Sequence, residues 1–77
     1  MTMAIYKVIS NNGNTIELVD INSSQPSPII LTMVNNSGCQ TVTLYDQTSV
    51  IWDFAGGPYK PSDYEVGKQF KLIQKIP

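Results

Sequence analysis

Residues 4–21 read AIYKVISNNGNTIELVDI, and this stretch decides the class of fold. Two runs rich in β-branched residues flank the pair Asn12-Gly13. Asn-Gly is a strong signal for a β-hairpin, because both residues tolerate the positive φ angles of the favoured two-residue turn. We therefore predict antiparallel strands over residues 3–10 and 15–21. A two-residue loop would place three pairs opposite each other: Ile9 with Ile16, Lys7 with Leu18, and Tyr6 with Val19.

The composition of the whole chain favours strands over helices. Ile, Val and Thr account for 21 of the 77 residues, whereas there are two Ala and four Leu. β-Branched residues suit strands, and Ala and Leu are the usual material of helices. The composition therefore disfavours an all-helical bundle. The apolar fraction of 42% is too high for a disordered chain, and the length suits a single domain over residues 1–77.

Four further strands are predicted between turn signals, at 29–34, 39–45, 50–55 and 70–76. A two-residue loop at Ser37-Gly38 would pair Met33 with Val42, Leu31 with Leu44, and Thr32 with Thr43, which gathers the apolar side chains on one face. The turn at 46–49 has no Gly, so the sequence leaves open whether Ile51 or Trp52 points inward. One helical turn, capped by Ser62 or Asp63, is expected within 56–68.

Short strands in hairpin order predict a small all-β domain, an antiparallel meander of five to six strands that is closed or curled into a barrel. The turn Val66-Gly67-Lys68 before the last strand resembles the corresponding turn of SH3-like and OB-like barrels. This resemblance covers a short segment and concerns general architecture, so it implies no function.

The charged residues exclude several classes of function. Five Lys face six acidic residues, the net charge is −1, and there is no His and no Arg. A duplex-DNA reader needs a cationic surface, usually with Arg, so we predict no duplex-DNA partner. One Cys and no His exclude a structural zinc site and an intrachain disulfide, and we predict neither a metal nor a cofactor.

The chain has no apolar run of 18 residues and no basic stretch before Lys7 of the kind found in signal peptides. We therefore expect no membrane span and a cytoplasmic location, which means the host cytoplasm if the protein is viral. Cys39 is interpreted as a small buried apolar residue, with an intersubunit disulfide or a reactive thiol as the alternatives.

No catalytic constellation is evident, and we predict that the protein is not an enzyme. Nucleophilic catalysis usually relies on a His that this chain lacks. The acid pairs Asp46 with Asp53 and Asp63 with Glu65 would be the candidates for acid–base work. Acids in such turns are usually solvated, and we interpret them in this way.

The segment 56–64 is the strongest candidate for a ligand site. Successive glycines can present backbone N–H groups to an anion, a lysine adds positive charge, and tyrosine rings offer faces for a base. We predict a small anionic or nucleotide-like ligand held by Gly56, Gly57, Tyr59, Lys60 and Tyr64. The alternative is a plain turn whose tyrosines close the open end of the barrel.

The first strand is apolar on both faces, which is typical of strands that are covered on both sides. We therefore predict a homo-oligomer with Ile5, Ile9, Val19 and Ile21 at the interface. The alternative is a tightly curled monomeric barrel.

These features predict a non-enzymatic, homo-oligomeric binding module for a small anionic ligand or a protein partner, such as a phage accessory or inhibitor protein. A structural or assembly protein that uses its sheet edges and apolar faces is the alternative. Single-stranded nucleic-acid binding by stacking on Trp52, Tyr59 and Tyr64 is a third hypothesis, which the lack of Arg disfavours.

Overall fold

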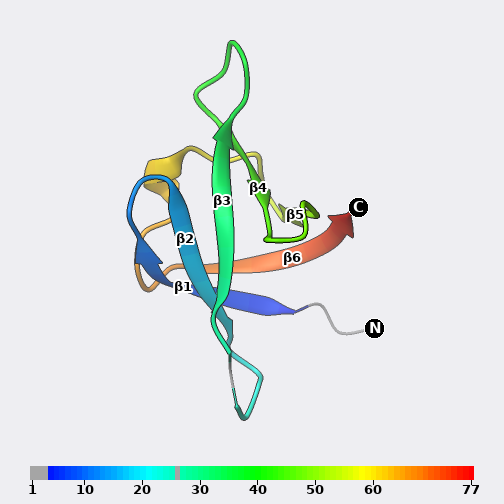
Figure 1. The fold of residues 1–77 in the computed structure, drawn as a ribbon. Coiled ribbons are helices and arrows are strands. Elements are labelled where there is room, and N and C mark those ends of the chain that lie inside the picture. Colours follow the sequence, from blue (N-terminus) through cyan, green and yellow to red (C-terminus); the bar gives the residue numbers. More distant parts are fainter. Residues whose placement is uncertain (1–3, 26) are drawn as a thin grey trace.

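The computed structural model describes residues 4–25 and 27–77, so Met3 and Pro26 lie outside the described residues. Six strands and one 3₁₀ turn follow in chain order: β1 (Ile5–Asn11), β2 (Thr15–Asp20), β3 (Ile29–Asn35), β4 (Val42–Tyr45), β5 (Ile51–Phe54), the 3₁₀ turn (Pro61–Asp63) and β6 (Gln69–Ile76). Each strand pairs antiparallel with the next, and β1 pairs with β6 to close a barrel. The predicted all-β antiparallel meander is confirmed (Figure 1).

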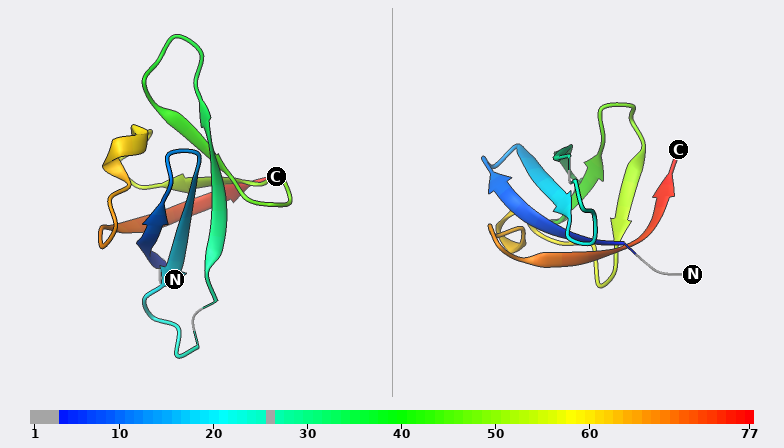
Figure 2. Two further views of the ribbon diagram at one scale, coloured as in Figure 1. Left: turned by 60° about the vertical axis from the view of Figure 1, so that its left-hand side comes forward. Right: turned by 90° about the horizontal axis from the view of Figure 1, so that it is seen from below.

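The strands of the barrel run in two main directions. Figure 2 shows β3 and β4 running steeply, whereas β5 and β6 lie side by side across them. The chain changes direction at the turn between β4 and β5, and this change positions the candidate site described below. The described residues contain one helical element, the 3₁₀ turn of three residues. No helix in this part of the chain is long and apolar enough to cross a membrane.

The core is built from the inward-facing side chains of all six strands together with Tyr64. Ile16, Leu18, Leu31 and Val8 are fully buried. An aromatic cluster fills one side, where Tyr6 packs edge-on against Trp52 with ring centroids 5.3 Å apart. The alternation of buried and partly buried positions along β4 and β5 shows that Trp52 and Phe54 share the inner face. The orientation that the sequence left open is thus settled in favour of Trp52.

The register predicted for the first hairpin is wrong by one residue. Val8, not Lys7, lies opposite Leu18, and a β-bulge between Val8 and Ser10 shifts the pairing again. Three residues, 12–14, separate β1 from β2, one more than predicted, and the N–H of Asn12 donates to the carbonyl of Thr15 (3.1 Å). The Asn12 side chain accepts from the N–H of Thr15 (2.8 Å) and so stabilises this longer turn.

The second hairpin keeps its predicted inner face but not its predicted pairs. Met33 pairs with Leu44, two positions away from the predicted partner Val42. A shift of two residues returns each side chain to the same face of a strand, so the apolar set still points inward. The shift arises because the strands end early: the N–H of Asn36 donates to the carbonyl of Thr41 (2.9 Å) and closes a longer loop.

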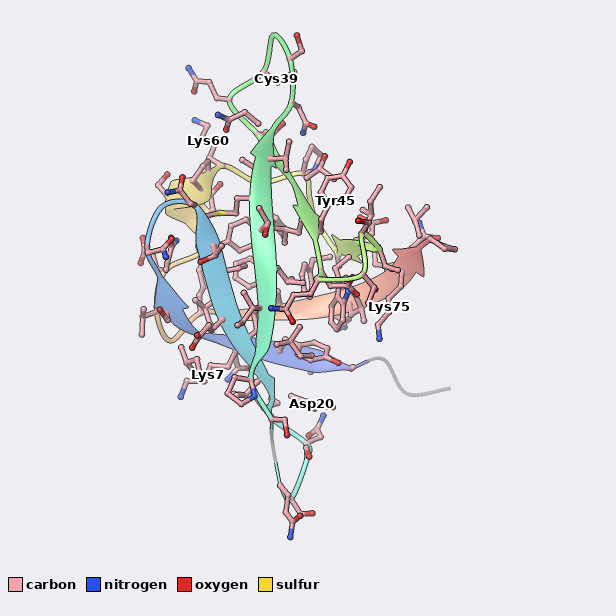
Figure 3. The ribbon with its side chains drawn as sticks, in the orientation of Figure 1. Lys7, Asp20, Cys39, Tyr45, Lys60 and Lys75 are labelled. Atoms are coloured by element: carbon pink, nitrogen blue, oxygen red, sulfur yellow. The ribbon has the colours of Figure 1, made fainter. Side chains whose placement is uncertain are left out.

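Cys39 lies in that longer loop and is exposed, so its interpretation as a buried residue is wrong. Figure 3 shows it at the tip of the loop between β3 and β4, away from the barrel. The predicted strand 39–45 begins only at Val42, which leaves residue 39 in the loop rather than on the inner face.

Asp46 organises the glycine-free turn between β4 and β5. Ser49 has a φ of 66°, which is unfavourable for a residue with a side chain. The Asp46 carboxylate compensates by accepting from the N–H groups of Thr48 (2.8 Å) and Val50 (3.1 Å). Its second oxygen accepts from the indole N–H of Trp52 (2.9 Å). Hydrogen bonds from Thr48 and Trp52, the largest causes, hold the pKa of Asp46 well below its usual range.

Replacing Asp46 with Asn is expected to lower the melting temperature by several degrees at neutral pH. In D46N, the amide oxygen would accept the N–H groups of the turn, so the amide NH₂ group would face the indole N–H of Trp52. Two donors cannot bond each other, and the hydrogen bond to Trp52 is therefore lost. The folded pKa lies below the unfolded value of about 3.8, so the stabilisation is present above that pH and is lost as pH falls below it. Thermal melts from about pH 6 to pH 3 should therefore fall more steeply for the natural protein than for D46N. Parallel slopes would contradict this role of Asp46.

Candidate functional site: a groove between β4 and β5

The barrel wall opens between β4 and β5. The two strands pair only at Tyr45 and Ile51, next to the turn that joins them. Further along β4, Val42 pairs instead with Tyr59, whose carbonyl accepts the Val42 N–H at 2.9 Å. The strands diverge because β5 follows the direction of β6 rather than that of β4 (Figure 2). A gap is therefore left between β4, β5 and the segment that follows β5.

This gap is a groove of about 290 Å³, which we call the β4–β5 groove. Its lining comes from residues 42–44 of β4, 51–54 of β5, residues 57–59, and the side chains of Tyr64 and Ile76. Aromatic rings form much of it, contributed by Trp52, Phe54, Tyr59 and Tyr64. An apolar concave site with a few polar groups is the usual form of a small-ligand pocket.

The aromatic walls are held in fixed positions. Trp52 donates its indole N–H to Asp46, and the ammonium of Lys75 lies 4.3 Å from the centre of the Trp52 ring. On the other side of the groove, Tyr59 packs edge-on against Tyr64, with ring centroids 5.6 Å apart. Tyr64 in turn packs on Phe70 at 4.9 Å. These contacts make the groove a preformed feature of the barrel.

Asp53, Thr43 and Tyr64 are among the polar residues that line this site. Asp53 lines the groove and accepts a hydrogen bond at Oδ2 from the amide of Gln74 (2.9 Å). Thr43 also lines it and donates its hydroxyl to Asn36 (2.7 Å). The third is Tyr64, whose residue is 2% exposed. Burial is the main cause that raises the pKa of the Tyr64 phenol, and Tyr59, Asp63 and Asp53 add to the shift, so this hydroxyl stays protonated.

The hydroxyl of Tyr64 is open to the groove. It takes part in none of the side-chain hydrogen bonds formed within residues 4–25 and 27–77. No fully enclosed side-chain oxygen in that part of the chain lacks a partner. The hydroxyl is therefore accessible, and the groove that Tyr64 lines provides the access.

Of the five ligand residues that the sequence predicts, three line the groove and two do not. Gly57, Tyr59 and Tyr64 contribute to the lining of the groove, whereas Gly56 and Lys60 lie outside that lining. Figure 3 shows Lys60 beside the 3₁₀ turn, well separated from Tyr45. The donors expected to hold an anion are engaged within the chain: the N–H of Gly57 bonds the carbonyl of Phe54 (3.2 Å), and the hydroxyl of Tyr59 bonds the carbonyl of Ala55.

The segment 56–64 also closes one end of the barrel. The amide of Asn11 donates to the carbonyls of Pro61 (3.1 Å) and Tyr64 (2.8 Å), which ties the 3₁₀ turn to the end of β1. The predicted helical turn is present, but Asp63 lies in its last position and reaches back to accept the N–H of Lys60 (2.9 Å). This packing matches the alternative in which the tyrosines close the barrel end.

Single-stranded nucleic-acid binding would need exposed aromatic faces, and two of the three proposed rings are buried. Trp52 is 5% exposed and Tyr64 is 2% exposed. Both rings pack against other core aromatics, so neither face is open to a row of stacked bases.

The predicted interface residues lie on the outer face of the barrel. Lys7 pairs with Val19, and the N–H of Ile21 donates to the carbonyl of Ile5 (3.0 Å), so the outward side chains of β1 and β2 are neighbours. Ile9 and Ile21 are 39% and 40% exposed. Tyr6 and Val8 point into the core, and the outer face of β1 carries the exposed Lys7 between Ile5 and Ile9. The homo-oligomer stays a prediction.

Sequence reasoning missed Thr43, Pro58 and Ile76 as parts of the site. Asp53 was considered only as one of a pair of acids, and its partner Asp46 is occupied in the turn and with Trp52. No local pattern marks these residues, because the divergence of β4 from β5 brings them together.

Comparisons with protein families, with characterised proteins and with solved structures found no match to this chain. The candidate site therefore rests on its own geometry.

Proposed function

We propose that the protein is a non-enzymatic binding module and that the β4–β5 groove is its ligand site. The observation that carries this proposal is the opening in an otherwise closed barrel: strands that pair at one position only, around a cavity of about 290 Å³ walled by fixed aromatic rings. Typical ligand pockets begin at about 300 Å³, so the groove suits a ligand the size of one ring.

The polar groups of the groove support binding rather than catalysis. Asp46 is occupied by the turn and by Trp52, and Asp63 is occupied by the N–H of Lys60. Among the described residues of the lining, Asp53 is the one acid, so acid–base catalysis by a pair of carboxylates lacks its second member there. The protonated hydroxyl of Tyr64, which borders an apolar space, is the kind of group that orients a ligand. A cytoplasmic location belongs to the same proposal, since the exposed free thiol of Cys39 suits a reducing compartment.

The proposal is tested by following backbone amide resonances while benzyl alcohol, a neutral one-ring probe, is added in the millimolar range. We expect the largest shifts at the amides of Thr43, Asp53 and Tyr59 and little change at Glu17, which lies on β2. Ile76→Trp should fill the groove and abolish these shifts, because Ile76 contributes to its lining.

The matched control is Ile73→Trp, which adds the same ring to the same strand at a position that is 52% exposed. I73W should bind the probe as the natural protein does. Uniformly small shifts, or equal loss of binding in both variants, would overturn the assignment of the groove as the site.

A further inference from the structure

We infer that the β4–β5 groove selects a small organic cation, an ammonium group on an apolar body. This inference rests on the proposed function and adds the charge of the ligand. It reverses the sign expected from the sequence, in which Lys60 was to attract an anion.

The first argument is the charge of the lining. Among the described residues that line the groove, Asp53 is the one charged side chain, and Lys60 is not part of the lining. Gln74 holds Oδ2 of Asp53, which leaves Oδ1 for a ligand. An anion in the groove would lie beside this carboxylate with no cation in the described lining to compensate it, whereas an ammonium would form a charge-assisted hydrogen bond with it.

The second argument is the balance of hydrogen-bond donors and acceptors. Three donors around the groove are already used: the Thr43 hydroxyl by Asn36, the Tyr59 hydroxyl by Ala55, and the Gly57 N–H by Phe54. The hydroxyl oxygens of Thr43 and Tyr59 and Oδ1 of Asp53 remain as acceptors, and the Tyr64 hydroxyl remains as one donor. Acceptors therefore outnumber free donors among these groups, which favours a ligand that brings its own donors.

The third argument is the aromatic lining. The faces of Trp and Tyr rings attract cations, and such contacts recognise ammonium ligands. Trp52 already attracts one cation within the chain, since the ammonium of Lys75 lies 4.3 Å from the ring centre. Lys75 lies outside the described lining, and Tyr59, which is only partly buried, is the ring of the lining that is more open to a ligand.

The test compares three probes of one shape and different charge: benzylammonium, benzyl alcohol and benzoate. Dissociation constants come from amide shifts of the groove residues at neutral pH and low salt. We expect benzylammonium to bind about fivefold more tightly than benzyl alcohol, and benzoate to bind most weakly. Asp53→Asn should remove most of the advantage of benzylammonium over benzyl alcohol.

Glu17→Gln is the matched control, because it makes the same change of net charge on β2, outside the groove lining. It should preserve the preference for benzylammonium. Raising the salt concentration gives a second measurement that needs no variant, because screening should reduce the preference for the cation.

The outcomes separate the inference from the proposed function. Binding of benzyl alcohol at the groove without a preference for benzylammonium, or a preference that D53N leaves intact, overturns the inference alone. Absence of groove shifts with all three probes overturns the proposed function as well. Tighter binding of the capped peptide acetyl-Gly-Lys-Gly-amide than of benzylammonium would overturn the assignment to a free small molecule.

Discussion

Replacing Leu18 with Ala is expected to remove a large share of the stability of the barrel. Leu18 is fully buried on the inner face of β2, where it lies opposite Val8. A buried Leu→Ala change costs about 2–5 kcal/mol, because apolar contacts are lost and a cavity remains. A domain of 77 residues has about 4–12 kcal/mol of stability in total. The variant should therefore unfold at a much lower urea concentration, as followed by the fluorescence of the single tryptophan, Trp52.

Val19→Ala is the matched control for Leu18→Ala and also tests the register of the hairpin. Val19 is the next residue on β2, faces outward beside Lys7, and is only partly buried. We expect its loss to cost well under half as much as the loss of Leu18. The register predicted from the sequence would instead place Val19 opposite Tyr6, which points into the core. A larger effect at Val19 than at Leu18 would contradict the inward placement of Leu18.

The fold class was accessible from the sequence because alternation is a local property. Apolar side chains recur at every second position of the predicted strands, for example at Val42 and Leu44, and inward placement follows from this pattern. Turn residues then marked where the strands end. The closure of β1 on β6 adds pairs such as Tyr6 with Phe70, which are too far apart in the chain for a local pattern to specify.

The registers were less accessible, because they depend on loop length. Asn12-Gly13 was correctly placed at a turn, but Asn14 joins the loop through side-chain hydrogen bonds that the two-residue motif does not encode. Likewise, the side chain of Asn36 accepts from Thr43 across the second loop and delays the start of β4. The exposure of Cys39 follows from this longer loop.

The candidate site was only partly accessible. The sequence directed attention to residues 56–64, and Gly57, Tyr59 and Tyr64 do meet at the groove. It could not show that the hydroxyl of Tyr59 is taken by Ala55. Nor could it show that Asp53, from β5, replaces Lys60 as the charged group of the site. The Tyr59 bond is formed within the segment after β5, whereas the place of Asp53 in the groove depends on the divergence of β5 from β4.

The second large effect is expected at Tyr64, which the sequence placed in a ligand loop and the structure places in the core. Its ring packs on Tyr59 and Phe70, and its carbonyl accepts from Asn11. Tyr64→Ala should cost about 3–5 kcal/mol, as for other buried aromatic rings. The melting temperature followed by circular dichroism should fall by at least about 12 °C.

Tyr64→Phe separates this structural role from a role in binding. It keeps the ring and its contacts with Phe70 and removes only the hydroxyl that opens to the groove. Because that hydroxyl is accessible rather than enclosed, its loss should change stability by no more than about 1 kcal/mol. A fall in melting temperature of only a few degrees for Y64A would show that the 56–64 segment is a surface loop independent of the core. A large fall in the melting temperature of Y64A with a small fall for Y64F would establish the ring as part of the barrel. Y64F would then be a folded protein in which the contribution of the hydroxyl to ligand binding can be measured directly.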